Sequence, residues 1–244
     1  MPRYKLTIEY DGTDFSGWQI QPDALTVEQV LEDAFSRKLQ QEIDLAGQGR
    51  TDAGVHASGQ VAHVDFPKNI DLDTLLNGVN KMIGRQVQVV ACEEVSDNFH
   101  ARFDGIAREY EYTFVNRSMP LRERYSWQYH RPVDVEKMQV CAGLLRGEHD
   151  FSGFSKYNED NLTTLCTVSE SYWEQNDEVM IYHVKANRFL RNMVRRLVGT
   201  MVWVGEGKIS KEDFERGLKY PSSNIATYTA PACGLVLKKV FYKK

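Results

Sequence analysis

A glycine-rich segment in the first quarter of the chain carries the side chains best suited to chemistry. It reads Gly47-Gln48-Gly49-Arg50-Thr51-Asp52-Ala53-Gly54-Val55-His56-Ala57. A backbone bent by these residues can display Arg50 and Asp52 at the mouth of a cleft, although glycine and aspartate are also what ordinary turns use. The segment is not a phosphate-binding loop, because no lysine follows its glycines. It also does not open a helix, as a dinucleotide-binding fingerprint would.

Positive charge is concentrated in a second stretch. The net charge of the chain is −4, which argues mildly against a nucleic-acid partner, but RNA responds to local patches rather than to the whole-chain charge. Arg188, Arg191 and Arg195 recur at helical spacing, which usually marks a solvated face. No acid occurs from 185 to 205, which favours phosphate contacts for Arg188 and Arg191 and a buried ion pair for Arg195. The cations of this stretch are Lys185, Arg188, Arg191, Arg195 and Arg196.

The sequence gives little support for metal sites, disulfides or membrane spans. Nothing near His56 or His63 supplies a third ligand at a usual spacing, so no metal is predicted. No apolar run is long enough to span a bilayer, and the N-terminus lacks the apolar core of a signal peptide. We therefore expect a cytoplasmic protein without a membrane contact. The cysteines are far apart and form no C-x-x-C pair: Cys92, Cys141, Cys166 and Cys233.

Hydrophobic patterns in the first half predict the order β-α-β-β-α-β. Alternating apolar residues predict strands, and Thr26 followed by Gln29 forms a capping box at the start of a helix. A second helix follows from apolar residues at helical spacing. The predicted elements are strands at 4–10, 62–66 and 86–92, a short apolar stretch at 43–46 in the place of the second strand, helices at 27–39 and 72–79, and a glycine-rich loop at 47–59.

The second half repeats this order. We predict an α+β fold of two ferredoxin-like, or RRM-like, β-α-β-β-α-β halves, 1–104 and 105–244. Their antiparallel sheets are expected to join and to leave an active-site cleft between the halves. The predicted elements are strands at 108–115 and 235–242, a hairpin of 164–174 and 178–186 turning at Asn176-Asp177, helices after Asp134 and Ser210, and a helix at 189–203.

The segment Gly49–Ala57 resembles, almost residue for residue, the central motif of the TruA family of tRNA pseudouridine synthases. Further segments resemble the family's motifs in the same order along the chain, and together they are highly specific. One departure is Cys233, which stands where a small residue is usual. The segments are 10–19, 58–63, 107–112, 147–154, 186–199 and 230–235.

This resemblance implies a role for each candidate residue. Asp52 would be the catalytic aspartate, and Arg195 would pair with it. Tyr110 would lie against the target uracil, although an aromatic residue in an alternating strand most often belongs to a core. Arg50 would take the space of the flipped base. The family acts on uridines 38, 39 and 40 of the tRNA anticodon arm, is a homodimer and needs no metal.

The chemistry of pseudouridine formation fits one carboxylate. The base is detached, rotated and reattached, so no redox cofactor or energy source is required. Three routes are open to Asp52: attack on C1′, addition to C6 of the base, or assistance of a glycal route. The rival functions are an RNA-binding protein of two RRM-like units, for which the RNP1 pattern is missing, and a metal-dependent hydrolase.

Overall fold

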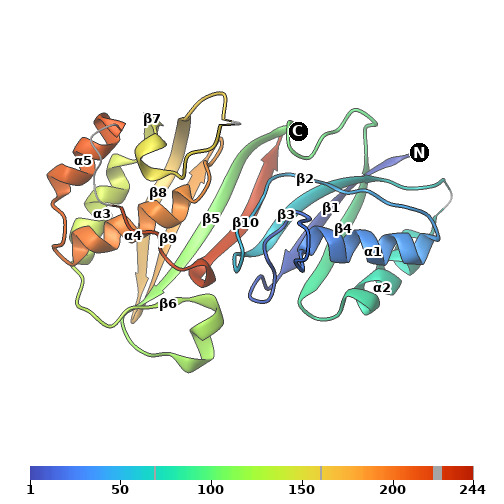
Figure 1. The fold of residues 1–244 in the computed structure, drawn as a ribbon, viewed down its shortest axis with the longest axis horizontal. Coiled ribbons are helices and arrows are strands. Elements are labelled where there is room, and N and C mark those ends of the chain that lie inside the picture. The colour runs from blue at the N-terminus through green and yellow to red at the C-terminus, as the bar shows by residue number, and fades with distance from the viewer. Residues whose placement is uncertain (69, 160, 222–226, 244) are drawn as a thin grey trace. The chain divides into compact units, whose positions relative to one another are not determined.

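The computed structural model describes residues 1–68, 70–159, 161–221 and 227–243, and the chain divides into two compact units (Figure 1). Unit 1 consists of Met1–Ile106 with Val236–Lys244, and unit 2 consists of Ala107–Leu235. Both units combine helices with a mostly antiparallel sheet, so the predicted α+β class is confirmed. Within the described ranges, no helix is long and apolar enough to cross a membrane.

Unit 1 is built on a sheet in the strand order β4-β1-β3-β10, with the short β2 also paired to β3. Every second side chain of β1 is buried, as its alternation predicts. Phe35 of α1 packs against Phe66, with ring centroids 5.2 Å apart, so α1 covers the end of β3. The elements are β1 (Arg3–Tyr10), α1 (Val27–Leu39), β2 (Ala46–Gly47), β3 (His56–Asp65), α2 (Leu72–Ile83), β4 (Val87–Val95) and β10 (Leu235–Tyr242).

The strand β3 is longer than predicted, because it begins at His56 instead of Ala62. The glycine-rich loop is therefore shorter than the expected 47–59. Gly59 looks like a loop residue in the sequence, but it lies inside the strand. A Cβ atom at this position would lie 2.2 Å from the carbonyl oxygen of Lys238 in β10, so the close approach of another backbone requires glycine here.

Unit 2 is built on a sheet in the order β5-β9-β8-β7, with β6 paired to β5. Tyr112 and Phe114 of β5 and Tyr182 of β9 are fully buried. The side chain of Asp134 caps α3 as predicted, by accepting from the amide of Lys137. The elements are β5 (Gly105–Val115), η1 (Pro120–Tyr125), β6 (Trp127–Gln128), α3 (Val135–Leu144), β7 (Gly147–Asp150), η2 (Ser152–Phe154), β8 (Leu165–Asn176), β9 (Val179–Ala186), α4 (Met193–Gly205), α5 (Lys211–Lys219) and η4 (Ala232–Gly234).

The helix predicted at 189–203 begins later, at Met193. Asn192 precedes it in the left-handed conformation, with φ 59°, so the helix cannot extend back through this residue. The predicted helical stripe is therefore wrong: Arg188 and Arg191 lie in the connection between β9 and α4, and only Arg195 is on the helix.

Candidate active site

Asp52 stands at the start of a tight turn in unit 1. Its carbonyl oxygen accepts from the amide of Val55 over 3.1 Å. Gly54, inside the turn, has φ 76°, a conformation that glycine adopts without a steric cost. Asp52 itself is half-buried. The turn thus fixes the backbone on the C-terminal side of the predicted catalytic aspartate.

The neighbouring Thr51 fixes the backbone on the other side. The hydroxyl groups of Tyr10 and Thr51 form a buried hydrogen bond of 2.8 Å. The amide of Trp18 donates to the carbonyl of Thr51 over 3.2 Å, and the amide of Gly54 donates to Phe15 over 3.2 Å. We call residues 10–18 the clamp, because this segment grips the Asp52 turn at both ends.

Gly17 allows the clamp to approach so closely. Its φ is 95°, and a Cβ atom at this position would lie 2.5 Å from the carbonyl oxygen of Thr51. Any other residue at position 17 would have to displace the loop or adopt a strained backbone. The sequence around Tyr10 to Gln19 therefore positions the Asp52 turn.

The clamp is tied in turn to the first turn of α1 through Glu28. One carboxylate oxygen of Glu28 accepts from the indole N–H of Trp18 over 3.0 Å, and the other accepts from the amide of Ile20 over 3.1 Å. Burial raises the pKa of Glu28, while these hydrogen bonds and the positive charge of Arg50 act in the opposite direction. Arg50 is exposed, and its positive charge acts on the Glu28 carboxyl group. Sequence reasoning missed Glu28, which stands out only as an acid in the first turn of a helix.

The two histidines considered as metal ligands each accept a hydrogen bond from a backbone amide. His56 is buried, and its Nδ1 accepts from the amide of Gly12 over 3.0 Å. The Nδ1 atom of His63 accepts from the amide of Ala101 over 3.2 Å. Across the described residues, no group of three His, Cys, Asp or Glu side chains is arranged to hold a metal ion.

Arg195 lies in the first turns of α4 in unit 2 and is bound to the C-terminal motif. Its Nε donates to the carbonyl oxygen of Ala230 over 2.8 Å, and the amide of Ala230 donates back to the carbonyl of Arg195 over 3.0 Å. Tyr112 fixes the same motif through a 2.9 Å hydrogen bond to the carbonyl of Pro231. These contacts set the direction of the half-buried Arg195 side chain.

Tyr110 projects from the same face of β5 as Tyr112, but it is only half-buried. Its ring meets Phe189 edge-on, with centroids 5.2 Å apart at an interplanar angle of 89°. Phe189 belongs to the connection between β9 and α4, so it supports the tyrosine from outside the sheet. Tyr110 is therefore a partly accessible aromatic surface rather than a core residue.

The remaining predicted RNA contacts lie in the same connection. Arg188 is half-buried and donates to the side chain of Asn161 over 3.3 Å. Arg191 is exposed, and its carbonyl accepts from the amide of Lys156 over 2.9 Å. Asp52 and Arg50 thus share one loop of unit 1, whereas Tyr110, Arg188, Arg191 and Arg195 belong to unit 2.

Comparison with known proteins places this chain in a family. The family model for tRNA pseudouridine synthase matches residues 6–104 and 141–243. These ranges include Asp52 and Arg195, whereas Tyr110 lies between them. Proteins named tRNA pseudouridine synthase A are 38% identical over 242 residues in Bacteroides fragilis, 39% over 243 in Chlorobium phaeovibrioides and 42% over 247 in Parvibaculum lavamentivorans. These alignments cover 98%, 99% and 100% of this chain and 96%, 100% and 100% of the relatives.

A solved Cbf5-Nop10-Gar1 complex is a distant neighbour, with a TM-score of 0.39 and 8% identity over 96% of this chain and 57% of that chain. This structural similarity is too low to assign a family, so the assignment depends on the relatives found by sequence, which match almost the whole chain. On those matches, and with the Asp52 motif inside them, the chain belongs to the tRNA pseudouridine synthase A family.

Proposed function

We propose that this protein isomerises uridine to pseudouridine in the anticodon arm of tRNA, at positions 38, 39 and 40. It would be an isomerase of the intramolecular-transferase type, with Asp52 as its catalytic carboxylate. The observation that carries the proposal is the immobilised turn of Asp52, which lies within a full-length match to proteins named for this activity. We place the reaction in the cytoplasm, with tRNA as substrate and no cofactor.

Pseudouridine formation requires a carboxylate in a defined position, and the turn fixes the backbone of Asp52. The bond between N1 and C1′ breaks, the uracil rotates, and a bond between C5 and C1′ forms. N1 gains a proton and C5 loses one, so atoms balance without a co-reactant. A carboxylate with a fixed backbone can attack C1′, add to C6 or assist a glycal route, since each demands a defined position relative to the sugar.

The other predicted residues receive supporting roles. Arg195 would keep Asp52 ionised, because a nearby guanidinium favours the charged form of a carboxylate and stays protonated at any working pH. Tyr110 would stack on the detached uracil while it rotates. Arg50 would fill the space left when the target base leaves the helical stack, which offsets the cost of unstacking of a few kcal/mol. The exposure of Arg50 and the half-buried ring of Tyr110 support these roles.

The finer architecture is part of the same proposal. We propose two ferredoxin-like halves, 1–104 and 105–244, whose sheets join and whose cleft forms the active site. The antiparallel pairing of β1 with both β3 and β4, and of β2 with β3, supports the ferredoxin-like order in the first half. Catalysis requires Asp52 of unit 1 to work together with Arg195 and Tyr110 of unit 2.

Replacement of Asp52 tests the proposal most directly. Asp52→Asn and Asp52→Ala should release no tritium from tRNA that carries C5-labelled uridine, yet still bind tRNA, because phosphate contacts elsewhere supply most of the affinity. The matched control is Asp44→Asn, which removes an exposed carboxylate before the same loop and should keep full activity. Activity of Asp52→Ala within about tenfold of the wild type, or about 1.4 kcal/mol in barrier, would sink the assignment.

We also propose a homodimer in which one tRNA contacts both subunits. A globular chain of 244 residues has a radius of gyration of only about 18 Å, so a second subunit extends its reach along the tRNA. Analytical ultracentrifugation at micromolar protein, with and without tRNA, should give the dimer mass. A monomer mass in an active enzyme–tRNA complex would rule the dimer out and leave the catalytic assignment intact.

A further inference from the structure

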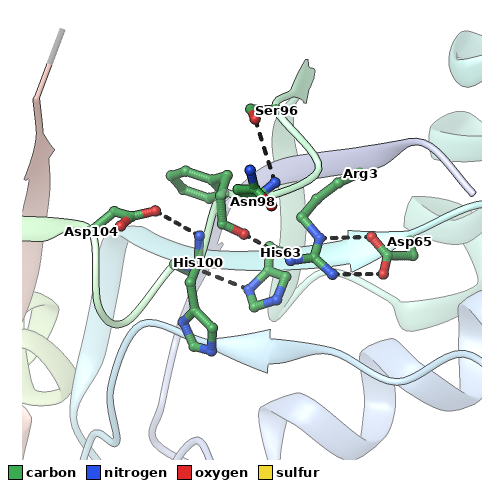
Figure 2. A network of polar contacts seen from close by, with 9 residues as sticks. Arg3, His63, Asp65, Ser96, Asn98, His100 and Asp104 are labelled. Carbon is green, nitrogen blue, oxygen red and sulfur yellow. Dashed lines mark hydrogen bonds and ion pairs between the residues drawn. The ribbon is translucent and has the colours of Figure 1, made fainter.

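The segment 99–104 of unit 1 forms a turn that is fastened to the sheet from several sides (Figure 2). The amide of Ala101 donates to the ring of His63 over 3.2 Å, and its carbonyl accepts from the hydroxyl of Tyr242 over 2.8 Å. Arg3 donates to the carbonyl of Phe99 over 3.0 Å. Ala101 is fully buried, and these hydrogen bonds hold the base of the turn to the sheet.

The turn is also locked internally. The carboxylate of Asp104 accepts from the amide of His100 over 2.7 Å, and the amide of Asp104 donates to the carbonyl of His100 over 3.0 Å. The amide of Arg102 donates to Nδ1 of His100 over 3.2 Å. These bonds fix the backbone of the turn and the ring of His100 without using the side chain of Phe103.

Three rings form a column that leads from the sheet to the surface. The centroids of His63 and His100 are 4.6 Å apart, and those of His100 and Phe103 are 4.3 Å apart. His63 is buried with 7% exposure, whereas Phe103, at the outer end, is 75% exposed. The guanidinium carbon of Arg102 lies 5.9 Å from the Phe103 centroid. The column therefore ends in an exposed ring beside a cation.

An exposed phenylalanine on a fixed backbone, beside an arginine, can stack an unpaired nucleobase. An aromatic ring accepts any base on its face, and the neighbouring cation can contact the phosphate that follows. Two acids close to the column have partners of their own: Asp104 caps the turn, and Asp65 pairs with Arg3 over 2.8 Å. The positive charge of Arg102 beside the exposed ring suits a polyanion better than a purely apolar surface, and RNA adds the unpaired bases that an aromatic ring can stack.

We propose that Phe103 and Arg102 form an RNA-stacking site, in which an unpaired base of the substrate tRNA lies on the exposed face of Phe103. Arg102 would contact the adjacent phosphate. The site would increase the affinity for the tRNA by binding unpaired nucleotides other than the uridine that reacts. The proposal rests on tRNA as the substrate, but it concerns binding and not the chemical step.

Binding assays with three variants test the site. Phe103→Ala should bind full-length tRNA roughly 5- to 150-fold more weakly, with an unchanged salt slope, because a stacking contact releases no counterions. Phe103→Trp should restore the affinity. Arg102→Ala should weaken binding and reduce the slope of log affinity against log salt by about one. The matched control is Met82→Ala, which truncates an exposed apolar side chain of α2 and should bind as the wild type does.

A loop-free RNA duplex of equal length separates stacking from backbone contacts. Phe103→Ala should bind the duplex as tightly as the wild type, since a duplex offers no unpaired base. Unchanged tRNA affinity in Phe103→Ala would overturn the site, and so would an equal loss for tRNA and duplex. Tritium release by the wild type is measured in parallel. A wild type that binds tRNA through Phe103 but forms no pseudouridine would refute the proposed reaction and leave the stacking site standing.

Discussion

The indole N–H of Trp18 donates to the carboxylate of Glu28 over 3.0 Å, while the amide of Trp18 holds the carbonyl of Thr51 over 3.2 Å. One buried tryptophan thus connects the first turn of α1 to the residue before Asp52. The positive charge of Arg50 also acts on Glu28, since it lowers the pKa of this carboxyl group against the effect of burial. The helix α1 is therefore connected to the loop of the proposed catalytic Asp52, and we expect Glu28 to help position Arg50 as well.

Replacement of Glu28 separates these two tasks. Glu28→Gln keeps an acceptor for Trp18, loses the second acceptor that serves the amide of Ile20, and removes the negative charge on which Arg50 acts. We expect a small loss of stability and a single-turnover rate lowered by about tenfold, because a misplaced positioning group weakens orientation. Glu28→Ala should also lose stability, by about 1–3 kcal/mol, since the buried indole N–H loses its acceptor. Pseudouridine formation and urea unfolding give the two readouts. A wild-type rate in Glu28→Gln would show that Glu28 does not position Arg50.

The two glycines that flank Thr51 in space offer a matched pair. Gly17→Ala should destabilise unit 1 by about 1–2 kcal/mol, because alanine at a φ of 95° is strained and its Cβ would meet the carbonyl of Thr51. The displaced loop should also lower the rate of pseudouridine formation. Gly49→Ala is the control, since a Cβ there meets no atom within 4 Å. Equal effects of the two changes on the urea midpoint and the rate would contradict the role of Gly17.

Local patterns in the sequence were sufficient for the elements that local interactions define. The helix α1 follows Thr26 as its capping residue predicts, and β1 follows from its alternation. The start of β3 was missed because Gly59 is required by the close approach of the carbonyl of Lys238, which is far away in the chain. The start of α4 was missed because the left-handed Asn192 leaves no mark on the hydrophobic spacing.

The same distinction applies to the candidate site. The motif around Asp52 is contiguous, so the sequence alone is sufficient to predict a site there. The clamp is not contiguous with it: Tyr10 and Thr51 are 41 residues apart, and their hydrogen bond leaves no periodic pattern. The partnership of Arg195 with Ala230 is likewise hidden, because 35 residues separate them and the acceptor is a backbone carbonyl.

A pH-dependent stability is expected from Glu32 in α1, which accepts from the amide of Leu45 over 2.7 Å. Burial raises its pKa to about 7, and the negative charges of Glu28, Asp44 and Asp33 add to the shift. The folded state therefore binds this proton more tightly than the unfolded chain, so stability falls as pH rises from about 4.5 to 7. Glu32→Gln should shift the urea midpoint upward at pH 8 relative to the wild type, with a smaller difference at pH 5. Glu9→Gln, at an exposed position of β1, controls for the lost charge, and an equal gain at both pH values would refute this role of Glu32.

The connection between β9 and α4 yields the last prediction, which concerns how RNA is held. Arg191 is exposed, whereas Arg188 is half-buried and bound to Asn161 over 3.3 Å. If both contact phosphates, Arg191→Ala should reduce the slope of log affinity against log salt by about one and leave stability unchanged. Arg188→Ala should reduce the slope similarly but also lower the urea midpoint, because it loses a structural hydrogen bond. The control is Lys219→Ala in α5, whose ammonium already pairs with Glu215 over 2.9 Å. Single-turnover rates at saturating tRNA should stay near the wild-type value in both arginine variants. An unchanged slope in either variant would show that the arginine replaced there is not a phosphate contact, and a large loss of the single-turnover rate would move it into the reacting site.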